Sequence, residues 1–423
     1  MASPVNPPRG MRDFLPADKA RRERVLGVIR AVFSSHGFDE IETPVMEDSA
    51  RLHAGLGGDN EKLAFGVLKR GLTAADFSSA TDALDLADLG LRFDLTVPLA
   101  RFYATHRAEL PTVFRAIQAA PVWRAERPQK GRYRQFVQCD IDIIGEAGPL
   151  AEIELLTATA DTFAALGLTG CTIRINDRRI LQSLLAYWEV DEAAMGRVLI
   201  TLDKEDKIGV DGVVAELAEL GLGRADIIAS VLLGNQLSSL AGDGWQLLDS
   251  AVPAWLDRAV YSELLALRTA LPNARVVFDP LLVRGMGYYT GTIFEIEHPD
   301  LPYSLGGGGR YDRMIGRFLG VDVPAAGFSI GFERIVDLVR LPGDEAGTGG
   351  IALIYDSEVT SATLMRLKTE LIASGRRVRL ERAPRNPKPL LAQLAASGFS
   401  EIATVSPGTT SLAELPVRKL AAE

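Results

Sequence analysis

Residues 122–146 read VWRAERPQKGRYRQFVQCDIDIIGE, and this stretch indicates the type of fold that the chain adopts. The central RPQKG of residues 127–131 has no apolar residue and contains proline and glycine, which is typical of a turn. Residues 120–125 before it and 133–144 after it are rich in aromatic and β-branched side chains, which predicts strands. The stretch therefore predicts a long antiparallel hairpin.

The returning strand of this hairpin has one polar and one apolar face. Because side chains alternate across a strand, Gln138, Asp140 and Asp142 are expected on one face and residues 139, 141 and 143 on the other. Arginines at positions 124, 127, 132 and 134 supply planar forks suited to phosphate. The combination predicts a binding floor. A solvated edge hairpin with weak surface ion pairs is the alternative.

The same stretch resembles motif 2 of class II aminoacyl-tRNA synthetases, in the form found in histidyl-tRNA synthetases. That form has an arginine, then E-R-P-Q-x-G-R-Y-R-x-F, then a glutamine and an acidic residue four positions later. Here these residues are Arg124, residues 126–136, Gln138 and Asp142. The resemblance places Asp142 in contact with substrate. Asp140 would repel it, so we expect an arginine such as Arg132 or Arg134 to neutralise Asp140.

Three later stretches are similar to further motifs of the same family. Residues 282–295, LVRGMGYYTGTIFE, predict a strand, a glycine bend and a second strand, and they resemble the signature R-G-[LM]-x-Y-Y, with Gly287 where an acidic residue is often found. Residues 306–312, GGGGRYD, resemble its second histidine signature. They are not a P-loop because no Lys-Ser/Thr follows, and their glycines would let the backbone approach a flat ligand. Residues 327–334, GFSIGFER, resemble motif 3 and end in Arg334.

Two stretches nearer the N-terminus complete the resemblance. A predicted helix, a strand over residues 38–43 and Pro44 correspond to motif 1, which implies a dimer interface, although Pro44 as a simple strand end is an equal alternative. Asp94 and Thr96 lie two positions apart and would share one face if extended. An Asp-x-Thr before proline is often only a turn or a helix cap. The resemblance assigns the pair to substrate histidine.

Composition sets further limits. The chain has 423 residues, 47% hydrophobic and 24% charged, which is ordinary for a globular protein of two to four domains. No run approaches about 18 apolar residues, and the N-terminus has no apolar signal core, so a cytoplasmic protein without a membrane span is expected. Cys139 and Cys171 lack CxxC partners and the four histidines lack ligand spacing, so no protein metal site is expected.

The predicted organisation has two domains. Residues 1–342 are expected to form an α+β catalytic domain, with a class II antiparallel sheet flanked by helices and a helical insertion at about 189–250. A Pro- and Gly-containing linker over residues 341–350 leads to a small C-terminal α/β domain, residues 349–423, with parallel strand pairing. This last unit carries a charge of +3 within a chain of −9, and the family places an anticodon-binding domain here.

The resemblance implies a histidine–tRNA ligase that uses ATP, with Mg²⁺ bound through the phosphates, to activate L-histidine and then charge tRNA(His). A homodimer is implied. Catalysis is assigned to Arg124 and Arg284; ATP binding to Arg124, Glu126, Arg132 and Arg334; and histidine binding to Asp94, Thr96, Arg124, Gln138, Asp142, Arg284, Tyr288 and Tyr289. The alternatives are a non-catalytic regulatory paralogue acting with ATP phosphoribosyltransferase in histidine biosynthesis, and a class II synthetase for another amino acid.

Overall fold

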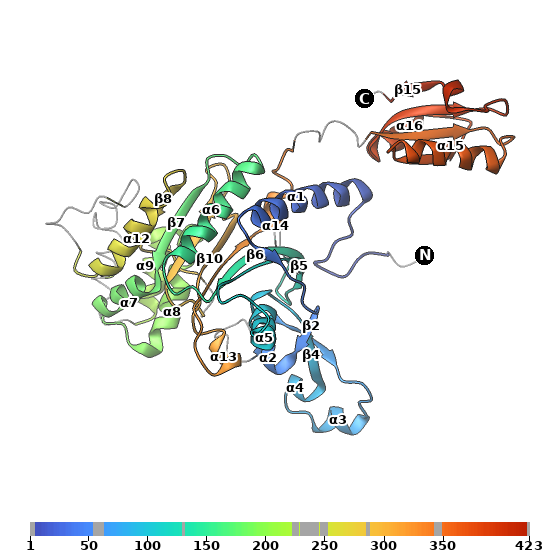
Figure 1. Ribbon diagram of the computed structural model, residues 1–423. Helices are drawn as coiled ribbons and strands as arrows, with labels where there is room; N and C mark the ends of the chain where they lie inside the picture. Colours follow the sequence, from blue (N-terminus) through green and yellow to red (C-terminus); the bar gives the residue numbers. More distant parts are fainter. Residues whose placement is uncertain are drawn as a thin grey trace. The chain divides into compact units, whose positions relative to one another are not determined.

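The computed structural model describes residues 5–53, 63–128, 132–221, 228, 245, 253–284, 288–341 and 349–420. The chain divides into two compact units (Figure 1). The larger contains Met1–Arg12 and Leu26–Val339, and the smaller contains Asp13–Val25 and Arg340–Glu423. The predicted linker lies mostly outside the described residues, and the division into catalytic and anticodon-binding-like domains stays a prediction.

The larger unit is built on one sheet. In the described chain it has eight strands in the order β1-β5-β6-β11-β10-β9-β7-β8. Their bounds are β1 Asp39–Glu40, β5 Phe114–Trp123, β6 Gln135–Ile144, β11 Ala325–Ile330, β10 Gly306–Arg310, β9 Thr292–Glu297, β7 Thr172–Asp177 and β8 Arg275–Phe278. β5 and β6 pair antiparallel over their full lengths, from Phe114 with Ile144 to Trp123 with Gln135, so the predicted hairpin is confirmed.

The sheet is antiparallel through its centre and parallel at both edges. β5, β6, β11, β10, β9 and β7 pair antiparallel, as expected. The edge pairs β1–β5 and β7–β8 are parallel, so the expected antiparallel sheet carries one parallel pair at each edge. Parallel neighbours need long crossover connections, and long connections containing helices separate both of these pairs.

Helices cover the sheet and close its core. α6 Leu150–Ala165 buries Leu155, Leu156 and Phe163 and packs on β6 and β11. α7 Arg178–Tyr187 begins at Asp177, whose side chain accepts a hydrogen bond from the backbone of Arg179 at 2.8 Å. α1 Pro16–Ser35, α5 Thr96–His106, α12 Arg258–Thr269, α13 Gly316–Leu319 and α14 Phe332–Ile335 complete the main helices of the described part. No helix among the described residues is both long and apolar enough to cross a membrane.

Two further substructures belong to the larger unit. A small antiparallel sheet is formed by β2 Met46–Asp48, β4 Ala87–Leu91 and β3 Phe65–Leu68, with the short helices α2 Ser49–His53, α3 Ala74–Ser79 and α4 Ala83–Leu86 beside it in the sequence. The predicted insertion begins with α8 Glu192–Leu202 and α9 Glu205–Glu219, which is interrupted at Gly209, where φ is 69°. Most of residues 222–252 lie outside the described residues.

The smaller unit is an α/β layer structure. Its sheet order is β13 Val378–Arg382, β12 Gly350–Tyr355, β14 Phe399–Val405 and β15 Val417–Lys419. The predicted parallel pairing holds for β12 with both β13 and β14, while the short polar β15 adds an unpredicted antiparallel edge. α15 Ser361–Ala373 packs with Ile351 and Leu353 of β12, and α16 Lys388–Ala396 packs with Ala352, so one helix covers each face.

Candidate active site

The residues assigned from the sequence come together in one cavity of the larger unit, with a volume of about 530 Å³. It is lined by Asp94, Thr96, Arg124, Glu126, Arg132, Gln138, Asp142, Arg284, Tyr288, Tyr289 and Arg334. Asp140, expected on the same polar face but not assigned a ligand, also lines it, and the lining residues that the sequence assignments missed include Glu295, Tyr311, Ser329 and Glu333. The structure therefore places every predicted site residue around a single space.

The floor of the cavity is a row of residues that face one another across neighbouring strands. Asp140 of β6 pairs with Ser329 of β11, Ser329 pairs with Gly307 of β10, and Gly307 pairs with Glu295 of β9. Partners in register point to the same face of a sheet, so these side chains share the cavity side. The predicted polar face of the returning strand is confirmed, since Gln138, Asp140 and Asp142 all line the cavity.

Glycines in this floor leave room for particular side chains. A Cβ on Gly307 would lie 2.6 Å from the guanidinium carbon of Arg284, and one on Gly309 would lie 2.9 Å from the ring of Tyr289. A Cβ on Gly327 would overlap the carboxylate of Asp142. The glycines were expected to admit a flat ligand directly. Instead, side chains of the protein lie against Gly307 and Gly309.

One wall of the cavity is acidic and buried. Asp94, Asp140 and Asp142 are only 1%, 4% and 4% exposed. Asp94 accepts a hydrogen bond from the backbone of Val97 at 3.2 Å, and Asp142 accepts one from the hydroxyl of Tyr311 at 2.5 Å. Among the described residues, Oδ2 of Asp94, Oε1 of Gln138 and Oδ1 of Asp140 are buried without a hydrogen-bond partner. Such acceptors indicate a place for a ligand that brings N–H donors.

Burial raises the pKa of all three carboxyls. It raises the pKa of Asp94 to about 6 and that of Asp142 to about 7. It raises the pKa of Asp140 well above its usual value, and the neighbouring Asp142 adds to this effect. A cationic ligand would favour the ionised forms of these groups and lower their pKa values again.

The expectation that Arg132 or Arg134 neutralises Asp140 is wrong. Arg134 donates from Nε to the backbone oxygen of Glu126 at 2.9 Å, and Arg132 lies 3.7 Å from the carboxylate of Glu126. Burial and the neighbouring Asp142 raise the pKa of Asp140, while the Ser329 side chain and Arg124 act in the opposite direction. The turn of the hairpin thus carries its arginines away from the strand position that the sequence suggested.

The cavity is also lined by cationic groups. Arg284 lies 3.1 Å from Glu295, and Arg334 donates to the backbone oxygen of Ser304 at 2.6 Å. Arg124 donates from Nε to the backbone oxygen of Phe93 at 3.0 Å. Together with Arg132, these guanidinium groups form a set that suits several phosphate groups in a row.

Tyrosines close the inner end of the cavity. The rings of Tyr288 and Tyr289 have centroids 4.9 Å apart, and Tyr311 meets Tyr288 edge-on at 6.0 Å. Tyr311 was not assigned from the sequence, although it belongs to the stretch GGGGRYD of residues 306–312, whose resemblance to the second histidine signature was a usable signal. Glu295 had no comparable signal.

Two local expectations differ from the structure. Residues 282–284 are not in a strand, and residues 285–287, including Gly287, lie outside the described part; β9 begins at Thr292. Thr96 is the first residue of α5 rather than part of an extended segment, yet both Asp94 and Thr96 line the cavity. The start of α5 brings the side chains of Asp94 and Thr96 to the same cavity. The prediction had relied instead on the alternation of side chains along an extended segment.

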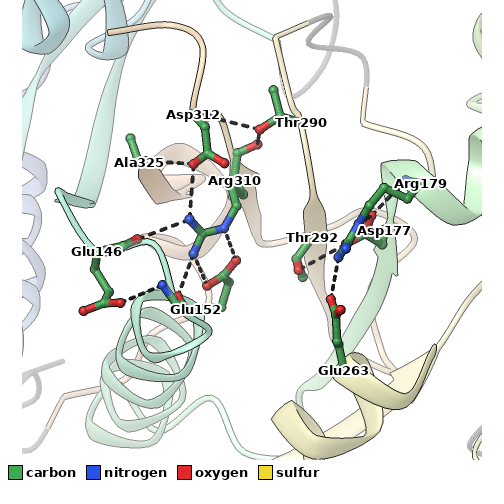
Figure 2. Close-up of polar contacts among 11 residues, drawn as sticks. Glu146, Glu152, Asp177, Arg179, Glu263, Thr290, Thr292, Arg310, Asp312 and Ala325 are labelled. Carbon is green, nitrogen blue, oxygen red and sulfur yellow. Dashed lines mark hydrogen bonds and ion pairs between the residues drawn. The ribbon is translucent and has the colours of Figure 1, made fainter. Parts of the chain in front are cut away.

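Arg310, the last residue of β10 and the neighbour of Tyr311, is buried and anchors this part of the chain. In Figure 2, Arg310 donates to the carboxylate of Glu152 on α6 at 2.6 Å and to Asp312 at 3.2 Å, while the backbone of Asp312 donates to Thr290 at 3.1 Å. The second cluster in Figure 2 joins Arg179 to Asp177. The first network links the neighbours of Tyr289 and Tyr311 to one another and to α6.

The side chains that line the cavity indicate how Mg²⁺ could be bound there. Among the described residues no group of three or more His, Cys, Asp or Glu side chains could hold a metal ion. Mg²⁺ prefers oxygen ligands and is usually bound through one or two carboxylates together with substrate phosphates. Glu295, beside Arg284, is a carboxylate of this kind. The residues present therefore fit an ion held mainly by phosphate oxygens.

Comparison with known proteins agrees with this geometry. A family model described as histidyl-tRNA synthetase matches residues 10–335. A histidine–tRNA ligase of Leifsonia xyli subsp. xyli is 61% identical, over 98% of this chain and 98% of its own length. A probable histidine–tRNA ligase of Tropheryma whipplei (strain Twist) is 45% identical, over 95% of this chain and 96% of its own length.

Solved structures show the same fold. The histidyl-tRNA synthetase of Nostoc sp. PCC 7120 has a TM-score of 0.71 and 25% identity, with 96% of this chain and 92% of that chain covered. An ATP phosphoribosyltransferase regulatory subunit/histidyl-tRNA synthetase from Bacillus halodurans C has a TM-score of 0.74 at 22% identity, with 96% of this chain and all of that chain covered, and this likeness concerns the fold alone. From the family model and the identity to its relatives, the chain belongs to the histidyl-tRNA synthetase family.

Proposed function

We propose that this protein is an active histidine–tRNA ligase. It would use ATP to convert L-histidine to histidyl-adenylate and then transfer the histidyl group to the 3′ end of tRNA(His). The observation that carries the proposal is the single cavity that joins a buried acidic wall to a set of guanidinium groups. An amino acid with an α-ammonium group suits the first wall, and a triphosphate suits the second.

In the first step a carboxylate oxygen of histidine attacks the α-phosphorus of ATP. An O–P bond forms, the bond to the bridging oxygen breaks, and pyrophosphate leaves with that electron pair. Such chemistry depends mainly on positioning and on stabilising charge. Arg124 lies in the same cavity as the other arginines and lowers the pKa of Asp140 in the acidic wall. From this position it would hold the α-phosphate and the histidine carboxylate together. Arg284 would stabilise the charge that develops at the phosphorus.

The rest of ATP would bind along the cationic side of the cavity. Glu126 would accept a hydrogen bond from the adenine amino group, and Arg132 and Arg334 would bind the outer phosphates. When bound, Mg²⁺ would supply positive charge to those phosphates, and Glu295 is a carboxylate of the cavity that could help to hold it. Arg334, which donates to the backbone oxygen of Ser304 at 2.6 Å, would exchange this hydrogen bond for one to a phosphate oxygen.

Histidine would be recognised by the acidic wall and the tyrosines. Asp94 and Asp142 would receive the α-ammonium and imidazole groups, and Thr96, Gln138, Tyr288 and Tyr289 would complete the pocket. Tyr311 would orient Asp142 through its hydrogen bond of 2.5 Å. A pocket of buried hydrogen-bonding groups discriminates strongly against amino acids that leave those groups unpaired.

We also propose a homodimer that forms through the small sheet. Met46, Phe65 and Leu91 pair in register across β2, β3 and β4, so they share a face, and Leu89 lies on that face two positions along. Met46 and Leu89 are 46% and 38% exposed. A second copy of the same face would remove this apolar surface from water. A location in the cytoplasm and contact of residues 349–423 with the anticodon remain parts of the proposal.

The regulatory alternative differs in what it predicts for catalysis. A non-catalytic paralogue has no need for Arg124, Arg284 and Arg334 around one cavity, and all three are present here. The deciding measurement is exchange of labelled pyrophosphate into ATP with each amino acid in turn. We expect exchange with histidine alone. Absence of exchange with every amino acid would support the regulatory protein, and exchange with a different amino acid would support another class II synthetase.

A further inference from the structure

The N-terminal segment Arg9–Arg12 contacts the two sequence motifs that surround the proposed ATP site. We propose that Arg12 is a positioning residue for ATP, and that it acts by neutralising Glu333 between the hairpin and Arg334. This inference rests on the proposed function. The predicted motifs did not include this segment, which the sequence indicates only as irregular chain.

Gly10 brings the segment against the hairpin. Its backbone oxygen accepts a hydrogen bond from the backbone of Arg134 at 2.8 Å, and the oxygen of Arg134 accepts one from the backbone of Arg124 at 2.8 Å. The φ angle of Gly10 is 84°, and a Cβ there would lie 2.9 Å from Pro128. Only glycine meets both conditions. The segment is therefore bound directly to the strand that pairs with Arg124.

Arg12 joins the hairpin to α14 through one guanidinium group. It lies over the ring of Tyr133 at 3.5 Å from the centroid and forms an ion pair with Glu333 of α14. The other carboxylate oxygen of Glu333 accepts a hydrogen bond from the backbone of Val137 on β6 at 3.2 Å. Arg132, beside Tyr133, and Arg334, beside Glu333, both line the cavity. Arg12 thus fixes the immediate neighbours of two arginines that would bind phosphate.

The charge of Glu333 explains why an arginine is needed at position 12. The side chain of Glu333 is only 6% exposed, and a buried carboxylate without a cation is strongly unfavourable. Without Arg12, Glu333 would attract the adjacent Arg334, whose guanidinium otherwise points to Ser304. By neutralising Glu333, Arg12 leaves Arg334 available to the outer phosphates of ATP.

The test compares Arg12→Ala with Arg9→Ala, which removes the same charge from an exposed residue of the same segment. Pyrophosphate exchange gives kcat and KM for ATP, and calorimetry without ATP gives the Kd for histidine. For Arg12→Ala we expect kcat/KM for ATP to fall about 10- to 100-fold, because small displacements of positioning groups have effects of this size. For Arg9→Ala, and for the histidine Kd of both variants, we expect changes below about two-fold, because these surface and remote changes touch no ATP contact.

A second comparison tests whether Arg12 acts through Glu333. Arg12→Lys keeps the positive charge and should recover part of the loss, while Arg12→Gln serves if Arg12→Ala does not fold. In the double variant Arg12→Ala/Glu333→Gln the buried negative charge is gone, so its loss should be no greater than that of Arg12→Ala alone.

A double variant that loses more activity than Arg12→Ala alone would overturn the inference. So would equal effects of the Arg9 and Arg12 variants, or a loss of histidine affinity in Arg12→Ala as large as its loss in kcat/KM for ATP. Absence of histidine-dependent exchange in the unmodified protein would instead refute the proposed function.

Discussion

Asp142 contacts or faces several of the residues that form the proposed histidine pocket. Its carboxylate lies over Gly327, accepts the hydroxyl of Tyr311 and is 4% exposed. It faces the same space as Asp140 and Asp94. A buried carboxyl among others of its kind is held partly protonated, and a cationic substrate would reverse this state. Histidine binding should therefore depend on pH through this group.

We expect Asp142→Asn to weaken histidine binding about 10- to 100-fold, because a charge-assisted hydrogen bond is lost. Asp140→Asn should have a smaller effect, since Arg124 and Ser329 already act on Asp140. Burial raises the pKa of Asp142 to about 7, so between pH 6 and pH 8 the free carboxyl loses its proton and the affinity for histidine should rise. Calorimetry with both variants over this range gives the measurement.

The titration of free histidine is the same for every variant. A difference in the pH dependence of affinity between variants therefore comes from the protein. Asp142→Asn should flatten the rise in affinity between pH 6 and pH 8. A rise of the same size in Asp142→Asn, or a larger loss of affinity in Asp140→Asn than in Asp142→Asn, would contradict the assignment of Asp142 to the histidine pocket.

At the scale of elements, β10 shows why four consecutive glycines occur in a buried strand. Alternate glycines point to opposite sides of the sheet. A Cβ on Gly307 would meet the guanidinium of Arg284, whereas one on Gly306 would lie 2.8 Å from the ring of Phe328, which stacks on Phe294 in the core. The glycines thus serve the cavity on one side and core packing on the other.

This difference yields a prediction for two neighbouring alanine substitutions. Gly307→Ala should displace Arg284, which is flexible at its far end, and should lower the rate of adenylate formation by about 100-fold or more. Its effect on stability should be small. Gly306→Ala should instead lower the free energy of unfolding by about 1–3 kcal/mol, because the core there is already full. Single-turnover kinetics and denaturant unfolding of both variants separate the two cases. Equal stability losses would argue against the proposed division of roles.

At the scale of the whole molecule, the small sheet presents the apolar face proposed for dimer formation. We expect the protein to sediment as a symmetric dimer at micromolar concentration. The double variant Met46→Glu/Leu89→Glu should shift it toward monomer, because two charges would face their copies across the twofold axis. Val321→Glu provides a control, since Val321 is 54% exposed and lies outside this sheet. A fully active monomer would disprove the dimer assignment.

The sequence by itself determined much of this protein. Turn residues and β-branched residues predicted the β5–β6 hairpin, and strand alternation correctly placed Gln138, Asp140 and Asp142 on one face. The sequence also predicted parallel strand pairing in the C-terminal α/β domain, and β12 pairs in parallel with both β13 and β14. These properties depend on neighbours in the chain, so they can be recognised locally. The resemblance of short motifs to the synthetase family indicated the site residues, and all of them line the cavity.

Only the tertiary structure decided how distant parts meet. Tyr311 binds Asp142 from 169 positions away, and Arg12 binds Glu333 from 321 positions away. The parallel edges at β1 and β8 likewise depend on crossover connections rather than on local patterns. Each of these contacts is fixed by strand register and by packing across the sheet, and neither leaves a signal in a short stretch of sequence. For this reason the residues that line the cavity could be predicted, while several of those that hold them in place could not.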